Sequence, residues 1–258
     1  MPFAANGVEV YYVDEGAGSE TVFFCHGAGG NSTSWWQQVP VFAERYRCLA
    51  HDHRGFGRTV CTPEAFDVGA FAADALAVMD AAGVESAHFV CQSMGGWTGV
   101  QLALRHPDRV RSLVLSDTIG GLALPSGLAS IRTMAERAQA AGAISPALGA
   151  DYHLRNPTGA FLYQQLSAFN SDQEVLGLFR KMFAAEAMVP IEHAYRLSLP
   201  MLIVAGTGDL IWPPEVLHEL AALLPDARVV EVDSGHSPYF ENPVAFNAAL
   251  DAFLASLV

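Results

Sequence analysis

The sequence contains little positive charge. It has 14 lysine and arginine residues against 27 aspartate and glutamate residues, which gives a formal net charge of −13. The few cations are scattered along the chain and form no basic patch of the kind that nucleic acids and anionic membranes require. We therefore expect neither nucleic acid nor a membrane as a partner.

Long apolar runs are also missing. Although 51% of the residues are hydrophobic, no segment approaches the ~18 consecutive apolar residues that a transmembrane helix needs. The amino-terminal residues Met1–Gly7 do not form a basic stretch followed by an apolar one, as a secretory signal does. These features predict a cytoplasmic protein.

Metal-binding patterns are a third absence. The four cysteines, Cys25, Cys48, Cys61 and Cys91, are not spaced as zinc ligands, and the nine histidines form no H-E-x-x-H motif. In a cytoplasmic chain the thiols are expected to stay reduced. The sequence thus predicts no metal, no disulfide and no bound cofactor.

What the sequence does contain is an alternation of strand and helix patterns, in a chain of 258 residues that can bury a large core. Strands are expected near Val8–Asp14, Thr21–Cys25, Tyr46–Ala50, Ser86–Cys91, Arg111–Leu115, Met201–Ala205 and Arg228–Val232. Helices are expected over Ser34–Ala43, Ala70–Ala82, Met94–His106, Glu215–Leu224 and Val244–Leu257. The alternation predicts a mostly parallel sheet covered by helices on both faces, with the first two strands as an antiparallel, hairpin-like pair at its edge.

The alternation stops between about Thr118 and Ser198, where we expect an inserted helical cap after the predicted strand Arg111–Leu115. Helical patterns cover Leu128–Ala141, Thr158–Phe169, Glu174–Ala185 and Ile191–Arg196. Many apolar side chains in this segment either shape a pocket for a hydrophobic acyl or ring moiety or pack the cap against the core. They are Phe161, Leu162, Tyr163, Leu166, Phe169, Leu178, Phe179, Met182, Phe183 and Met188.

The segment Cys91–Gly96 is typical of a nucleophile elbow. Ser93 stands between a predicted strand and a predicted helix, where a sharp turn would hold its hydroxyl above the sheet. The helix that follows would offer backbone N–H groups to a developing oxyanion. Cys91 replaces the first glycine of the usual G-x-S-x-G pattern, and cysteine is still small enough for such a turn.

Two later residues supply the partners that a serine nucleophile needs. Asp209 follows the strand pattern ending at Ala205, and His236 follows the one ending at Val232. Because the carboxyl ends of parallel strands share one edge of a sheet, residues far apart in sequence can meet there. His236 would act as the base for Ser93, and Asp209 would hold the imidazole in the correct tautomer.

A loop near the amino terminus completes the predicted site. His26–Gly30 follows the apolar strand Thr21–Cys25. The backbone N–H groups of Ala28 and Met94 would together form the oxyanion hole.

With these motifs and Asp52–Gly57, the chain resembles the α/β-hydrolase family. Within it the chain is most similar to small microbial carboxylesterases and to hydrolases of the 3-oxoadipate enol-lactone hydrolase and C–C bond hydrolase type. The resemblance implies an α/β fold with a mostly parallel eight-stranded sheet flanked by helices and a helical cap after strand 6. Residues 1–118 and 198–258 would form the core, and residues 119–197 the cap that closes over the elbow.

The resemblance also implies an activity. We expect a serine hydrolase of the 3.1.1 type that cleaves a carboxylic ester or lactone of a small, largely hydrophobic substrate through an acyl-enzyme. Asp117 is an alternative acid, because some family members place the acid after the sixth strand. Ser237 stands where many C–C bond hydrolases carry tryptophan, which disfavours that activity.

Two other functions stay open at this point. The same triad could hydrolyse a C–C bond in a β-diketone or ring-cleavage product. The fold could also serve a hydrolase-like ligand receptor or a cofactor-free lyase or oxygenase. A monomer and a homodimer are both compatible with the sequence.

Overall fold

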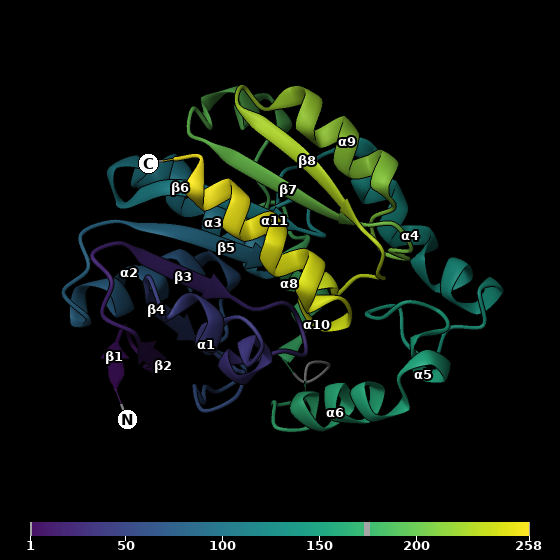
Figure 1. The fold of residues 1–258 in the computed structure, drawn as a ribbon, viewed down its shortest axis with the longest axis horizontal. Coiled ribbons are helices and arrows are strands. Elements are labelled where there is room, and N and C mark those ends of the chain that lie inside the picture. The colour runs from purple at the N-terminus through teal and green to yellow at the C-terminus, as the bar shows by residue number, and fades with distance from the viewer. Residues whose placement is uncertain (1, 173–175, 258) are drawn as a thin grey trace.

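The computed structural model describes residues 2–172 and 176–257 and has one eight-stranded sheet at its centre (Figure 1). The strands follow the order β1-β2-β4-β3-β5-β6-β7-β8 across the sheet. The six strands from β4 to β8 in this order are parallel, whereas β1 and β2 are antiparallel at one edge. The strands are β1 Phe3–Ala5, β2 Glu9–Glu15, β3 Thr21–Cys25, β4 Arg47–His51, β5 Ala87–Gln92, β6 Val110–Ser116, β7 Met201–Gly206 and β8 Ala227–Val232. The predicted fold class is confirmed.

The central strands are covered on both faces. In β3 and β5 every residue is buried, as the continuous apolar runs of their sequences predict. Their registers place Cys25 beside Cys91, so the loops that follow the two strands start next to each other at one edge of the sheet. The strands thereby bring the loop at His26 and the turn at Ser93 together.

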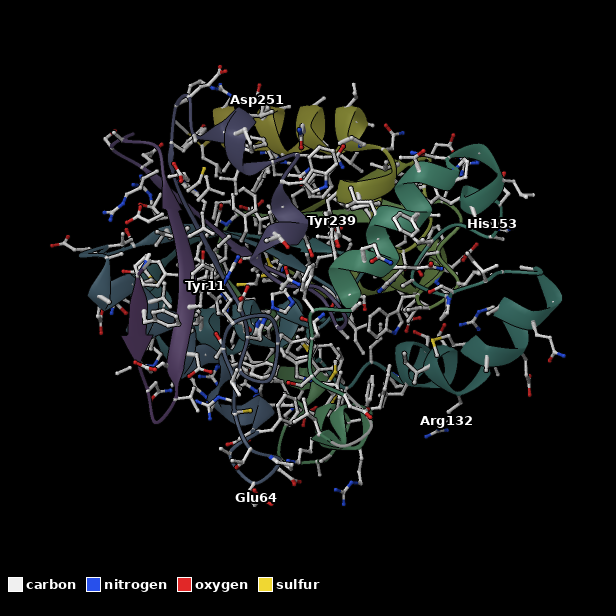
Figure 2. The ribbon with its side chains drawn as sticks, turned by 90° about the horizontal axis from the view of Figure 1, so that it is seen from below. Tyr11, Glu64, Arg132, His153, Tyr239 and Asp251 are labelled. Carbon is white, nitrogen blue, oxygen red and sulfur yellow. The ribbon has the colours of Figure 1, made fainter. Side chains whose placement is uncertain are left out.

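Helices of the core form two layers. The helices α2 (Phe71–Ala81), α3 (Gly95–Arg105) and α9 (Pro214–Leu223) share one hydrophobic cluster with one face of the sheet. The helices α1 (Val39–Phe42) and α11 (Pro243–Ala255) share the other cluster with the opposite face. Figure 2 shows Asp251 on the outer side of α11, while Tyr239 of the short helix α10 (Pro238–Glu241) lies in the buried interior.

The chain between β6 and β7 is helical. It contains α4 (Pro125–Ala140), α5 (Tyr152–Arg155), α6 (Pro157–Ser167), α8 (Leu178–Met182) and the 3-10 helix η4 (Ile191–Arg196). In Figure 1, α4, α5 and α6 extend to one side of the sheet. The first two residues of the predicted helix Glu174–Ala185 lie outside the described residues, and α8 is shorter than that prediction. The exact division into core and cap stays a prediction.

Two details of the sequence-based prediction are wrong. The segments Val8–Asp14 and Thr21–Cys25 were expected to pair as a hairpin, but β4 lies between β2 and β3. The strand β3 is buried along its whole length, which fits a place inside the sheet. Both of its edges are paired there, with β4 and β5. The predicted helix Ser34–Ala43 is also interrupted: a 3-10 turn, η1 (Ser32–Trp35), precedes α1. Pro40 cannot continue a helix from the preceding turn and instead occupies the start of α1.

The sequence analysis predicted no strand at Phe3–Ala5, where the edge strand β1 lies. It has only three residues, of which Ala4 alone is buried, so the alternation was too short to detect. In the described part of the chain, no helix is long and apolar enough to cross a membrane.

Candidate active site

Ser93 occupies a strained turn between β5 and α3. Its φ angle is +48°, a left-handed conformation that side chains other than glycine rarely adopt, and such strain is typical of functional sites. The turn is tight because α3 starts against the end of β3: a Cβ atom at Gly95 would overlap the Cys25 carbonyl oxygen. The hydroxyl of Ser93 is thus held at the carboxyl edge of the sheet.

The cysteine in place of the first glycine of the elbow has a structural explanation. The Cys91 side chain is fully buried and points at α3. A Cβ atom at Gly99 would lie 2.6 Å from the Cys91 Sγ atom. Gly99, eight residues later on α3, therefore leaves the room that the Cys91 sulfur needs beside the helix.

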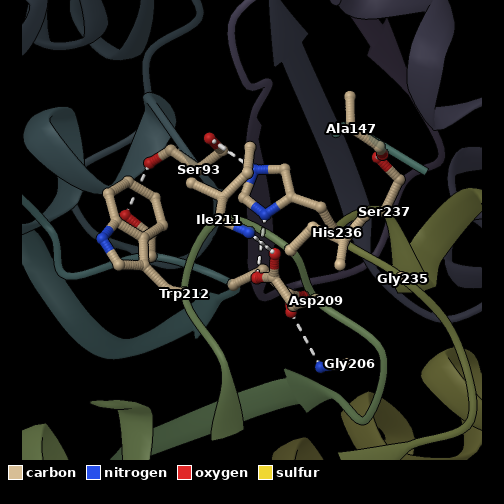
Figure 3. A network of polar contacts seen from close by, with 12 residues as sticks. Ser93, Ala147, Gly206, Asp209, Ile211, Trp212, Gly235, His236 and Ser237 are labelled. Carbon is tan, nitrogen blue, oxygen red and sulfur yellow. Dashed lines mark hydrogen bonds and ion pairs between the residues drawn. The ribbon is translucent and has the colours of Figure 1, made fainter. Parts of the chain in front are cut away.

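The structure brings Ser93, His236 and Asp209 together (Figure 3). The Ser93 Oγ atom lies 2.9 Å from His236 Nε2, and His236 Nδ1 lies 2.9 Å from Asp209 Oδ2. The three residues are 9%, 3% and 3% exposed. Because a carboxylate accepts the Nδ1 proton, Nε2 is free to accept the serine proton. This arrangement is that of a nucleophile, a base and an orienting acid.

The loop after β7 fixes the carboxylate of Asp209. Its second oxygen, Oδ1, accepts a hydrogen bond of 2.7 Å from the backbone N–H of Ile211. The neighbouring Trp212 packs its ring 5.9 Å from the His236 ring, centroid to centroid. The imidazole is therefore held from both its polar and its apolar side.

Asp117, the alternative acid, lies behind Asp209. It also has a positive φ angle, +47°, and its Oδ1 atom accepts a hydrogen bond of 2.7 Å from Gly206 N–H. Burial, followed by the charge of Asp209, raises the pKa of Asp117 well above its usual range. Asp209, and not Asp117, is the acid whose carboxylate contacts the imidazole.

The predicted oxyanion donors adjoin the nucleophile. Met94 follows Ser93 directly, and Ala28 lies with Ser93 in the wall of the same cavity. In the described part of the chain, neither backbone N–H donates a hydrogen bond to a protein acceptor. Two donors without an acceptor beside a serine hydroxyl fit the geometry of an oxyanion hole, and their role stays a prediction.

A buried histidine pair supports the loop that carries Ala28. The His26 Nε2 atom accepts a hydrogen bond of 3.0 Å from His53 N–H, so its Nδ1 atom carries the proton and donates to the Gly27 carbonyl at 2.8 Å. Burial lowers the pKa of His26 to about 4. A neutral imidazole therefore connects the loops after β3 and β4.

Two polar residues of the site were not singled out for a role there by the sequence motifs. The Gln92 side chain donates to the His236 carbonyl at 2.9 Å and so connects the elbow to the histidine loop. Glu241 accepts hydrogen bonds from Gly149 N–H at 2.9 Å and Ser237 N–H at 3.2 Å. Gln92 gives no signal in the sequence because its contact is long-range, whereas Glu241 could have been suspected as an acid one helical turn after His236.

A cavity of about 230 Å³ opens beside Ser93 and His236. Its walls come mainly from the cap segment and the loop after β7, and they are mostly apolar. Of the apolar residues that the sequence suggested for a pocket, only part contribute. The lining includes Ile131, Met134, Pro146, Tyr163, Phe179, Met182, Phe183, Ile211 and Trp212.

Within the described ranges, one cluster of metal-ligand side chains was found, and it consists of Asp117, Asp209 and His236. Their ligand atoms lie within 4.8 Å of one another. These atoms already hydrogen bond to one another, to Ser93 and to backbone N–H groups. The arrangement therefore fits a proton-transfer chain better than a metal site.

Comparison with known proteins places this geometry in context. The family model described as the alpha/beta hydrolase fold matches residues 20–243. A candidate carbamate hydrolase, RutD of Azorhizobium caulinodans, is 30% identical over 276 residues, which cover 100% of this chain and 99% of the relative. The enol-lactonase from Burkholderia xenovorans LB400 has a TM-score of 0.82 at 28% identity, with 98% of this chain and 100% of that chain covered. Est816, described as an N-acyl homoserine lactone degrading enzyme, has a TM-score of 0.78 at 28% identity over 98% and 100% of the two chains.

Proposed function

The chain belongs to the α/β-hydrolase family, and on that premise we propose that it is a serine hydrolase of a small, largely hydrophobic carboxylic ester or lactone. The observation that carries this proposal is the hydrogen-bond chain from Ser93 through His236 to Asp209, at the mouth of an apolar cavity. A serine hydroxyl is a poor nucleophile by itself, and this chain supplies the base that it needs.

Acylation begins when Ser93 Oγ attacks the substrate carbonyl carbon and passes its proton to His236 Nε2. Asp209 stabilises the imidazolium that forms, because its carboxylate already accepts the Nδ1 proton at 2.9 Å. The imidazolium then donates the proton to the leaving alcohol oxygen. The product of this half-reaction is an acyl-enzyme on Ser93 and, for a lactone, the alcohol stays attached to the acyl chain.

The tetrahedral intermediate carries a negative oxygen that needs hydrogen-bond donors. The backbone N–H groups of Ala28 and Met94 supply two of them, and Met94 also lies at the positive amino-terminal end of α3. One such donor contributes roughly 3 kcal/mol of transition-state stabilisation in enzymes of this type. Deacylation repeats the sequence with a water molecule that His236 activates.

The apolar lining of the cavity supports a hydrophobic acyl or ring moiety. Met182, Phe183 and Trp212 contribute three of its large side chains. The resemblance to an enol-lactonase and to an N-acyl homoserine lactone degrading enzyme supports lactones as well as open-chain esters. The alternative substrates with a C–C bond to cleave remain possible outcomes of the test below.

The test is hydrolysis of a chain-length series of p-nitrophenyl esters and of γ-lactones by wild type and by Ser93→Ala. We expect turnover that peaks at one chain length and falls by about 10⁵-fold or more in the variant, because the nucleophile is lost. Ser256→Ala, on the exposed carboxyl-terminal end of the chain, serves as the matched control and keeps wild-type turnover.

A phosphonofluoridate that labels active serines provides a second measurement. Labelling of Ser93 by one equivalent of this reagent, without turnover of any ester or lactone, would favour the C–C bond substrates instead. Turnover that survives in Ser93→Ala, or labelling at another residue, would overturn the serine mechanism.

A further inference from the structure

The cavity beside Ser93 is lined without a lysine, arginine, aspartate or glutamate side chain among the described residues. The residues outside the described ranges include no lysine or arginine either. His236 is the one lining group that gains a positive charge, and the proposed reaction uses that charge for proton transfer. A substrate group bound in this cavity finds no fixed cation.

None of the six lysine and arginine residues of the cap segment lines the cavity, and two of them bind backbone carbonyls elsewhere. Arg137 of α4 donates to the backbone carbonyls of Leu210 and Ile211, each at 3.1 Å. Lys181 of α8 donates to two backbone carbonyls in the loop before α2, at 2.8 and 2.7 Å. Figure 2 shows Arg132 on the outer side of α4, where its side chain is exposed.

One polar group in the wall of the cavity, the Tyr163 hydroxyl, offers a hydrogen-bond acceptor to a substrate. The Ser237 hydroxyl donates to the Ala147 carbonyl at 2.8 Å, so its oxygen accepts the proton of the Tyr163 hydroxyl at 3.2 Å. With its proton engaged, Tyr163 presents only lone pairs to the cavity. A carboxylate at this wall would meet acceptors and find no donor in the pair.

Anions also surround the histidine loop. Asp209 hydrogen bonds to His236, and the Glu241 carboxyl group accepts N–H groups from both Gly149 and Ser237 beside it. Burying a further negative group without a partner is strongly unfavourable, because it loses its hydration and gains no counter-charge. A neutral group of the same size carries no such penalty.

We propose that this site selects uncharged substrates and discriminates against esters and lactones that carry a carboxylate on the acyl chain. This selectivity rests on the proposed serine hydrolase activity, and it narrows the substrate class to neutral acyl groups. The charge of the substrate, rather than its length alone, then decides which esters turn over.

The experiment compares two p-nitrophenyl esters of nearly equal size that differ in charge: the mono-p-nitrophenyl ester of adipic acid, with its free carboxylate, and the ester in which a primary amide replaces that carboxylate. Hydrolysis of the p-nitrophenyl bond is followed at pH 7.5 with wild type and Ser93→Ala. We expect kcat/KM to be about 100-fold higher for the neutral ester, since an unpaired buried charge is this costly.

Met134, which lines the cavity from α4, allows the charge to be changed on the protein side. Met134→Arg places a cation at the wall and should lower the neutral-to-anionic ratio by at least tenfold. Met134→Gln, of similar length but neutral, should keep the wild-type ratio.

The outcomes separate the two levels of the proposal. Similar wild-type rates on both esters, abolished in Ser93→Ala, would overturn the charge selectivity and leave the serine mechanism intact. Equal turnover by Ser93→Ala and wild type would overturn the proposed function and the selectivity together. A ratio that Met134→Gln shifts as much as Met134→Arg would show that size and not charge decides, and this too would overturn the selectivity.

Discussion

The carboxyl edge of the sheet and the cap segment contribute to the same cavity in different ways. At the sheet edge, each candidate catalytic residue follows the end of a strand within a few residues: Ser93 follows β5, Asp209 follows β7 and His236 follows β8. In the cap segment, lining residues such as Ile131 and Tyr163 come from helices whose spacing bears no relation to the strands. The backbone of the sheet therefore positions the candidate reacting groups, whereas side-chain packing in the cap segment shapes the space for the substrate.

Hydrogen bonds join the two regions at many places, among them those from Arg137 to the Leu210 and Ile211 carbonyls. The Trp97 indole N–H of α3 donates to the Met182 carbonyl at 3.1 Å, and Tyr163 contacts Ser237 at 3.2 Å. The side chains with which the cap segment lines the cavity are mostly apolar, so they act on a substrate through shape more than through hydrogen bonds. Substitutions in the cap segment should therefore change selectivity first, and substitutions at the sheet edge should change the chemistry first.

After the loss of the nucleophile in Ser93→Ala, the largest expected effect comes from Asp209 at the sheet edge, with Asp117 as the acid for comparison. Asp209→Asn should lower kcat by about 10⁴-fold, because an amide no longer selects the productive tautomer of His236. Asp117→Asn should cost tenfold or less, because among the described residues it is Asp209 that hydrogen bonds to His236, and asparagine preserves the acceptor for Gly206 N–H. Both variants are measured on the best p-nitrophenyl ester, with circular dichroism as the control for folding. A larger loss in Asp117→Asn than in Asp209→Asn would show that Asp117, and not Asp209, is the acid that supports His236.

The second effect concerns stability in acid. Burial lowers the pKa of His26 to about 4 and that of His51 to about 3, from an ordinary value near ~6.5 in the unfolded chain. Below pH 6.5 the unfolded state binds protons that the folded state excludes, so the free energy of unfolding falls as the pH decreases toward 4. At pH 5 the loss is on the order of 2 kcal/mol for each histidine.

Urea unfolding at pH 7 and pH 5, followed by tryptophan fluorescence, measures this loss. His51→Asn cannot take up the proton, so the difference in its unfolding free energy between the two pH values should be smaller than that of wild type by about 2 kcal/mol. The comparison between variant and wild type isolates His51 from the carboxyl groups that titrate in the same range. An unchanged pH dependence in the variant would contradict the neutral, buried state of this histidine.

The smallest effect is expected in the cap segment. Ile131→Phe extends a side chain into the cavity and should lower kcat/KM for long-chain p-nitrophenyl esters about tenfold, with a weaker effect on the acetate, since overpacking excludes the longer acyl group. Ile131→Ala is the matched variant and should shift the optimum toward longer chains. A uniform loss on every chain length in both variants would mean that the cap segment supports the catalytic geometry and does not only shape the pocket.

The sequence predicted a mostly parallel sheet and the positions of most core helices, because strand and helix periodicities are local signals. It missed the three-residue strand β1 and misplaced the pairing of β2, because a short edge strand carries little periodicity and its partner is chosen by the rest of the sheet. The residues Ser93, Asp209 and His236 could be named in advance because each stands in a motif after a strand. The polar contacts of Gln92 and Tyr163 could not be predicted, because they join segments far apart in the sequence.

The sequence alone was enough to name the candidate reacting groups and the edge of the sheet at which they meet, since parallel strands necessarily end side by side. The tertiary structure was needed to show which of the two buried acids contacts the imidazole, because Asp117 and Asp209 follow adjacent strands and differ in their contacts. It also decided the size of the cavity and the absence of a fixed cation in its described walls. These properties depend on how the helices of the cap segment pack over the sheet edge, and no local pattern in the chain encodes that packing.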